Sequence, residues 1–317
     1  MVQTKALYNL LRLNAAEDPS VKVDSWALQD FRSIPLDELF ARLEKSGIRL
    51  DKAGFHQFSD PCDTPEELAD LLLPDDISEA DRDPLYLLIF EVWRRLLPEK
   101  QSLSIFCDEI DYRISLYDQE DLKSDELIQD ALANLLEVLE ENTDAGAEPE
   151  AVFTAICEYC AHDLESFLYE YISDLLDSGN SLYASELVEG FSPYILEPLW
   201  FDFLRVRLLG FTDSNDANTG IRKLLESDLE LLLILEIVRF LSFNGEHELF
   251  SLAVNKALPL LAESDELNDL MAMVADYYRR LDLDDMEEKI QKLIDKRKDA
   301  PIRPEELKIL KDLLATS

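Results

Sequence analysis

The chain has 317 residues, of which 68 are acidic and 30 are lysine or arginine, so its formal net charge at pH 7 is -38. Hydrophobic residues nevertheless make up 47% of the sequence, which excludes a disordered polyelectrolyte. Because phosphate groups require a basic surface, this charge argues against direct binding to nucleic acid. The two nearest glycines, Gly47 and Gly54, are too far apart for the phosphate-binding loops of nucleotide-binding folds.

The sequence predicts a cytoplasmic protein that does not enter a membrane. Residues 1–15 lack the apolar run of a secretory signal. The longest strongly apolar run, 229–243, is interrupted by Glu230, Glu236 and Arg239. Four cysteines without regular spacing suit reduced thiols better than a disulfide framework. The oligomeric state is left open.

Leucine greatly outnumbers valine in this chain, and leucine favours helices whereas β-branched residues favour strands. We therefore expect an all-α protein with no substantial sheet. In chain order, the predicted helices are 36–45 ending before Gly47, 68–73 capped by Thr64 and Pro65, 85–97 between Pro84 and Pro98, 103–117, 127–140, 149–175, 182–188, 194–209 ending at Gly210, 221–225, 229–243, 247–261, 267–281, 286–297 and 305–314.

The clearest of these helices begins at Pro149. Apolar residues recur at steps of three and four from Val152 to Leu175, which indicates about seven turns with one apolar face. The Gly179-Asn180 pair is a typical helix stop and predicts where this helix ends.

Short connections between the predicted helices indicate antiparallel helical hairpins. Their succession is similar in architecture to an irregular HEAT or armadillo solenoid, although a multi-helix bundle fits equally and no fixed-period repeat is present. Residues 1–50 carry seven acids and seven bases, whereas the rest of the chain is strongly acidic. We therefore expect a small helical domain at 1–80, an acidic helical domain at 81–211 and a helical-hairpin domain at 212–317, the last two either separate or one body.

The distribution of charge is the strongest functional signal. Between Lys123 and Arg205 lie 81 residues with no lysine or arginine, and these residues include 19 Asp and Glu. Opposite charges normally alternate on exposed surfaces because like charges repel, so a region of one sign suggests that a cationic partner relieves the repulsion. The same region is rich in aromatic residues, whose ring faces also attract cations.

We therefore expect a non-enzymatic interaction adaptor or scaffold that binds a basic protein or peptide. The predicted contact residues are Glu158, Glu165, Glu170, Asp174, Asp177, Glu186 and Glu189, with Tyr169 and Tyr183 as aromatic contacts. The alternative is that the rings form core and the acids only a solvated face. A rigid array of carboxylates that mimics nucleic acid is a further alternative.

Three pairs of arginines, Arg94 and Arg95, Arg205 and Arg207, and Arg279 and Arg280, lie late in predicted helices. Cations are favoured there, so local ion pairing explains them, and an anion-binding cluster formed by their convergence is the alternative.

No catalytic residue, metal ligand or cofactor is predicted. The His162-Asp163 doublet resembles the paired ligands of HD-type metal phosphohydrolases, which are also all-helical. This resemblance implies a metal-dependent hydrolase as the alternative function, with its other ligands unidentified. Cys157 and Cys160 have C-x-x-C spacing, but no second cysteine pair completes a zinc site, so we expect them to pack in the core.

Overall fold

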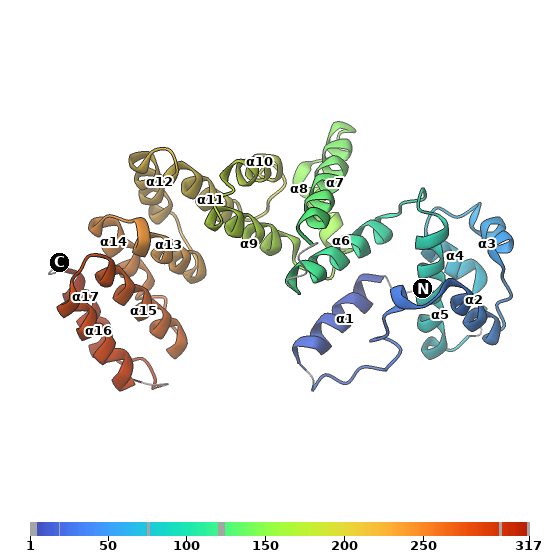
Figure 1. Ribbon diagram of the computed structural model, residues 1–317, viewed down its shortest axis with the longest axis horizontal. Helices are drawn as coiled ribbons and strands as arrows, with labels where there is room; N and C mark the ends of the chain where they lie inside the picture. The colour runs from blue at the N-terminus through green and yellow to red at the C-terminus, as the bar shows by residue number, and fades with distance from the viewer. Residues whose placement is uncertain (1–4, 19, 75–76, 120–123, 298–299, 316–317) are drawn as a thin grey trace. The chain divides into compact units, whose positions relative to one another are not determined.

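A computed structural model describes residues 5–18, 20–74, 77–119, 124–297 and 300–315 (Figure 1). These residues form seventeen α-helices and one short 3-10 helix, and no strand occurs among them. The predicted all-α class is therefore confirmed. No helix within these ranges combines the length and the apolar character needed to cross a bilayer. The chain divides into two compact units, Met1–Phe167 and Leu168–Ser317.

Unit 1 is organised around one long, buried helix. Its elements are α1 (Lys5–Glu17), η1 (Phe31–Ser33), α2 (Leu36–Lys45), α3 (Lys52–Ser59), α4 (Pro65–Leu72), α5 (Glu79–Leu96), α6 (Leu103–Asp118), α7 (Ser124–Asp144) and α8 (Pro149–Cys157). Helix α5 buries Tyr86, Phe90 and Trp93 and packs against α2, α4 and η1, while α6 packs against α1 and α7.

The hydrophobic core around α5 runs from Tyr8 to Leu97, so the predicted boundary near residue 80 falls inside it. The three-domain division itself stays a prediction.

Unit 2 is built from consecutive helical hairpins. Its elements are α9 (Leu164–Asp177), which begins in unit 1, α10 (Ser181–Phe191), α11 (Pro198–Gly210), α12 (Ser214–Glu226), α13 (Leu231–Asn244), α14 (His247–Ala257), α15 (Ser264–Arg280), α16 (Asp284–Arg297) and α17 (Pro304–Ala315). Helices α11 and α12, α13 and α14, and α15 and α16 pack as neighbours, and α12 also packs against α14 and α13 against α15 (Figure 1). Each hairpin therefore packs against the next and shares its hydrophobic core, an arrangement that is found both in solenoids and in helical bundles.

Several predicted helix ends are confirmed. Helix α2 has its predicted bounds, and Gly47 follows it with a φ of 91°. At the start of α4, the Thr64 side chain accepts a hydrogen bond of 3.1 Å from the backbone N–H of Glu67. These short-range signals are reliable because a cap depends only on residues within one turn of it.

Other predicted helix boundaries are wrong. Helix α5 does not begin at Pro84 but at Glu79, where Ser78 caps it by accepting from the backbone N–H of Asp81 at 3.2 Å. The polar stretch 212–219, which falls between the predicted helices 194–209 and 221–225, lies largely in α12, because Asp213 accepts from the backbone N–H groups of Asn215 and Asp216. Helices α1 and α3 are not predicted from the sequence at all.

The predicted continuous helix 149–175 is also wrong, because the chain breaks between α8 and α9. At the break, the carboxylate of Asp111 on α6 accepts hydrogen bonds from the backbone N–H groups of Ala161, at 2.9 and 3.0 Å, and His162, at 3.1 Å. Asp163 then caps α9 by accepting from the backbone N–H groups of Glu165 and Ser166. A buried carboxylate from a distant helix therefore overrides the local helical periodicity.

The backbone conformation of Gly179, just after α9, predicts how a substitution at this position changes stability. Gly179 has a φ of 81°. Its backbone N–H donates to the carbonyl of Leu176, and the backbone N–H of Asn180 donates to the carbonyl of Leu175. An added Cβ strains this conformation, so we expect Gly179→Ala to lower the free energy of unfolding by about 1 kcal/mol in urea denaturation.

Gly210 at the end of α11 is the control, since a Cβ there would meet Phe240 at 3.6 Å, an ordinary contact. We expect Gly210→Ala to leave stability unchanged or raised by up to about 1 kcal/mol. Equal losses in both variants would refute this explanation of the helix end.

Candidate functional site

The predicted contact residues of unit 2 lie on two consecutive helices. On α9, Glu170, Asp174 and Asp177 are exposed and follow each other at steps of four and three, so they share one side of the helix. On α10, Glu186 and Glu189 are exposed and continue a row that Leu182 begins with the same spacing. We call these six residues, Glu170, Asp174, Asp177, Leu182, Glu186 and Glu189, the acidic face.

The structure does not bring all predicted contact residues into this face. Glu158 is exposed at the end of α8, and Glu165 is half-buried in the first turn of α9. Both belong to unit 1, whereas the acidic face belongs to unit 2. The five acids of the acidic face are thus the predicted acidic contacts that lie in unit 2, and Leu182 is an addition from the structure.

Arg207 on α11 fixes α9 from the inside of unit 2. Its guanidinium is almost fully buried and donates to the Ser173 hydroxyl at 2.5 Å and to the Asp177 carboxylate at 2.6 Å. Because Asp177 is itself 72% exposed, one side of its carboxylate pairs with the interior while the other meets solvent. Sequence reasoning missed this pairing, since the two residues lie on different helices.

The aromatic residues of the acidic region lie mostly in the interior. Tyr169 packs its ring against Trp200, with centroids 4.6 Å apart, and burial raises the pKa of its hydroxyl above the usual value, so the phenol stays neutral. Tyr183 is half-buried on α10. The rings that are fully buried are Phe153, Phe167, Tyr171, Phe191, Tyr194, Phe201 and Phe203. For these seven rings, the alternative interpretation as core is the correct one.

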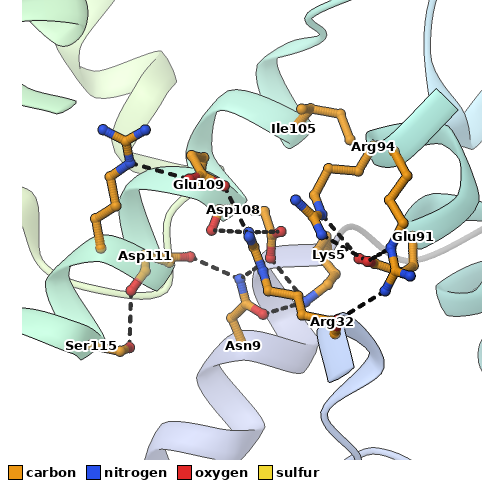
Figure 2. A network of polar contacts seen from close by, with 12 residues as sticks. Lys5, Asn9, Arg32, Glu91, Arg94, Ile105, Asp108, Glu109, Asp111 and Ser115 are labelled. Carbon is orange, nitrogen blue, oxygen red and sulfur yellow. Dashed lines mark hydrogen bonds and ion pairs between the residues drawn. The ribbon is translucent and has the colours of Figure 1, made fainter. Parts of the chain in front are cut away.

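A second cluster of charge lies inside unit 1, centred on Asp108 of α6 (Figure 2). Its carboxylate pairs with Lys5 at 3.0 Å and Arg32 at 2.7 Å, and it accepts from the Asn9 amide at 3.0 Å. Burial alone would raise the pKa of Asp108, but the charges of Lys5 and Arg32 and the hydrogen bonds outweigh it and lower that pKa to about 2. Asp108 is therefore ionised and ties α1 and η1 to α6.

The arginine pairs at helix ends are each held by nearby groups. In unit 1, Glu91 accepts from Arg94 (Figure 2) and from Arg95, and Arg95 also donates to the backbone carbonyls of Phe31 and Ile34 at η1. In unit 2, Arg205 pairs with Asp202, Arg279 with Asp276 and Glu287, and Arg280 with the carbonyls of Phe243 and Gly245. Each arginine of the three pairs, including Arg207 with Asp177, therefore bonds to another group of the chain, and such pairing explains them better than an anion-binding cluster.

His162 pairs with Asp111 rather than with its neighbour Asp163. The Nδ1 atom of His162 lies 2.9 Å from the Asp111 carboxylate, which also accepts from the Asn9 amide at 3.1 Å. Nε2 of the same ring is buried and has no partner in the described part of the chain. The Asp163 carboxylate is used to cap α9. Among the described residues, no three His, Cys, Asp or Glu side chains are arranged to hold a metal ion.

Three cysteines lie near this pair, and the thiols of Cys157 and Cys160 are protonated at neutral pH. Cys107 is buried and donates to the Ile156 carbonyl, while Cys157 and Cys160 are half-buried and all of them are free thiols. Burial raises the pKa of Cys157 to about 12. Hydrogen bonding to Cys107, together with burial, also raises the pKa of Cys160. Such thiols are poor nucleophiles, because the thiolate is the reactive form.

A cavity of about 370 Å³ opens beside these groups in unit 1. It is lined by α1, the chain at η1, α5, α6 and His162. Its size is that of small-molecule sites in proteins.

Comparison with known proteins finds no match to this chain, neither among the family models, nor among curated proteins, nor among solved structures.

The Asp108 cluster predicts a pH-dependent stability. Asp108→Asn keeps the shape of the side chain but leaves Lys5 and Arg32 without their buried counter-charge, so we expect the free energy of unfolding at pH 7 to fall by about 3 kcal/mol in urea denaturation. Glu109→Gln is the matched control: Glu109 also pairs with Arg32 but is 37% exposed, and its loss should cost under about 1 kcal/mol.

The pH dependence of this difference has a definite sign. The pKa of Asp108 is about 2 in the folded chain against the ordinary value of 3.8, so the ionised carboxylate stabilises the fold above pH 3.8 and loses this effect as the pH falls toward 2. The gap between the wild-type chain and Asp108→Asn should therefore narrow below pH 4. A gap that stays constant down to pH 2 would contradict the assignment.

Proposed function

We propose that the chain is a non-enzymatic interaction adaptor whose acidic face binds a basic segment of a partner protein. The observation that carries this proposal is the pair of exposed rows on α9 and α10 within a stretch of sequence that contains no lysine or arginine. Such rows attract cationic groups over a distance comparable to the Debye length, about 8 Å at physiological salt. Charge complementarity of this kind raises the rate of association and selects against acidic partners.

Leu182 narrows the chemistry of the partner. Its side chain is 74% exposed and begins the row that Glu186 and Glu189 continue on α10. An exposed leucine beside carboxylates suits a segment that alternates basic and apolar residues, because the partner's lysine or arginine stems cover apolar surface while their charged ends reach the acids. The partner that fits best is therefore an amphipathic basic helix or extended segment.

The two alternative functions have less support. A metal-dependent phosphohydrolase at His162 and Asp163 requires these side chains to be available to a metal, whereas His162 is bonded to Asp111 and Asp163 caps α9. Nucleic-acid mimicry would use the same acidic face, but it requires the partner to be a nucleic-acid-binding protein. Competition by duplex DNA distinguishes it, since DNA displaces the chain only from such a partner.

The test uses the full chain and a labelled synthetic peptide that alternates lysine and leucine on opposite faces. We expect saturable binding in fluorescence anisotropy that weakens as salt is raised. The double variant Glu186→Lys with Glu189→Lys should bind the peptide about tenfold more weakly, because each reversal turns an attraction into a repulsion.

The matched control is Glu226→Lys with Asp269→Lys, which reverses two exposed acids of unit 2 outside the acidic face. Its net charge equals that of the test variant, and its affinity should stay close to that of the wild-type chain. If both variants weaken binding equally, attraction by the net charge alone explains the binding and the acidic face is not a specific site.

A further inference from the structure

Three of the acids in the wall of the unit 1 cavity, Asp108, Glu91 and Asp111, are already engaged by other groups of the chain, and the fourth, Asp30, is exposed. Asp108 pairs with Lys5 and Arg32, and Glu91 pairs with Arg94 and Arg95. Asp111 accepts from Asn9, from two backbone N–H groups and from His162. These carboxylates therefore have few lone pairs left for a ligand, although they belong to a chain with 68 acids.

Arg12 on α1 lines the same cavity and differs from the other arginines of the chain. It is half-buried, yet no carboxylate or carbonyl within the described ranges pairs with its guanidinium. The two other arginines whose side chains lack such a partner there, Arg49 and Arg303, are exposed to solvent. None of the Arg12 guanidinium nitrogens is among the buried polar atoms that lack a partner in the described part of the chain, so this group stays accessible to a ligand in the cavity.

The packing of α1 on α6 shows where Arg12 lies along the cavity. Lys5 pairs with Asp108 and Asn9 with Asp108 and Asp111, so the two helices run side by side in the same direction. One turn further along, this register brings Arg12 to the level of Ser115, beyond the satisfied cluster around Asp108. The apolar side chains of Leu13, Leu87 and Leu116 line the cavity as well.

We propose that this cavity binds a small organic anion, whose carboxylate or phosphate group pairs with Arg12 and whose apolar part contacts the leucines. The planar guanidinium suits either oxyanion, because both accept two parallel hydrogen bonds from it. The cavity volume of about 370 Å³ admits a ligand of this kind. The site belongs to unit 1 and is independent of the acidic face.

The experiment titrates the full chain with hexanoate, with hexyl phosphate and with 1-hexanol at constant ionic strength. Binding is followed by isothermal calorimetry and by NMR of the histidine rings, which number only 3. His162 lines the cavity and reports on it, whereas His56 and His247 do not line it and serve as internal references; single His→Gln variants assign the signals. We expect a saturable shift of the His162 signal with one or both anions, which identifies the preferred oxyanion, and no saturable shift with 1-hexanol.

Variants of Arg12 test which group binds the anion. Arg12→Gln should raise the dissociation constant at least tenfold, and Arg12→Lys, which keeps the charge but loses the planar pair of donors, should have an intermediate effect. Arg49→Gln removes an exposed arginine of the same unit and should leave binding unchanged. Circular dichroism checks that each variant is folded.

Three outcomes would overturn the proposal. The first is the absence of a saturable His162 shift with both anions. The second is binding of 1-hexanol as tight as that of the anions, which would make the cavity merely apolar. The third is equal weakening by Arg12→Gln and Arg49→Gln, which would reflect net charge rather than a site.

Discussion

The structure depends on how a strongly acidic chain uses its few cations. Most of the buried or half-buried basic side chains connect elements that are distant in the sequence. Arg95 on α5 donates to carbonyls at η1, Arg207 on α11 holds α9, and Arg297 on α16 bonds Asn268 on α15 and Glu306 on α17. A buried guanidinium stabilises such a junction only when its donors are satisfied, since an unpaired buried charge costs several kcal/mol. The buried and half-buried cations therefore act as internal links between elements.

Two features follow from this use of charge. Where the sequence supplies no cation, between Lys123 and Arg205, α9 and α10 carry the acidic face, and Arg207 of α11 pairs with one of its acids, Asp177. Arg12 has no acidic partner among the described residues, and we propose that an external anion pairs with it. The proposed protein partner and the proposed small ligand thus both follow from how few cations this chain has: the acidic face has an excess of acids, and the unit 1 cavity holds an arginine without an acid partner in the described part of the chain.

Sequence patterns predicted what depends on near neighbours and missed what depends on distant ones. The all-α class, α2 and the caps at Thr64 and Gly47 follow from residues within a turn or two. The break between α8 and α9 does not, because Asp111 lies 50 positions before the Ala161 backbone N–H that it binds. For the same reason the sequence paired His162 with its neighbour in the HD doublet, whereas folding pairs it with Asp111. The excess of acids was recognisable from the sequence alone, but that Arg12 lines a cavity and has no acid partner among the described residues becomes visible only once α1 packs on α6.

The central claim is that the exposed acids of α9 and α10 repel one another, while buried ion pairs such as those of Glu91 on α5 are little affected by salt. Hydrogen–deuterium exchange at about 20 mM and about 500 mM NaCl tests it directly, since salt screens exposed charges far more than buried ones. The account predicts that amide protection rises severalfold with salt across α9 and α10 and changes much less across α5. A uniform rise along the whole chain, or a fall in α9 and α10, would contradict it.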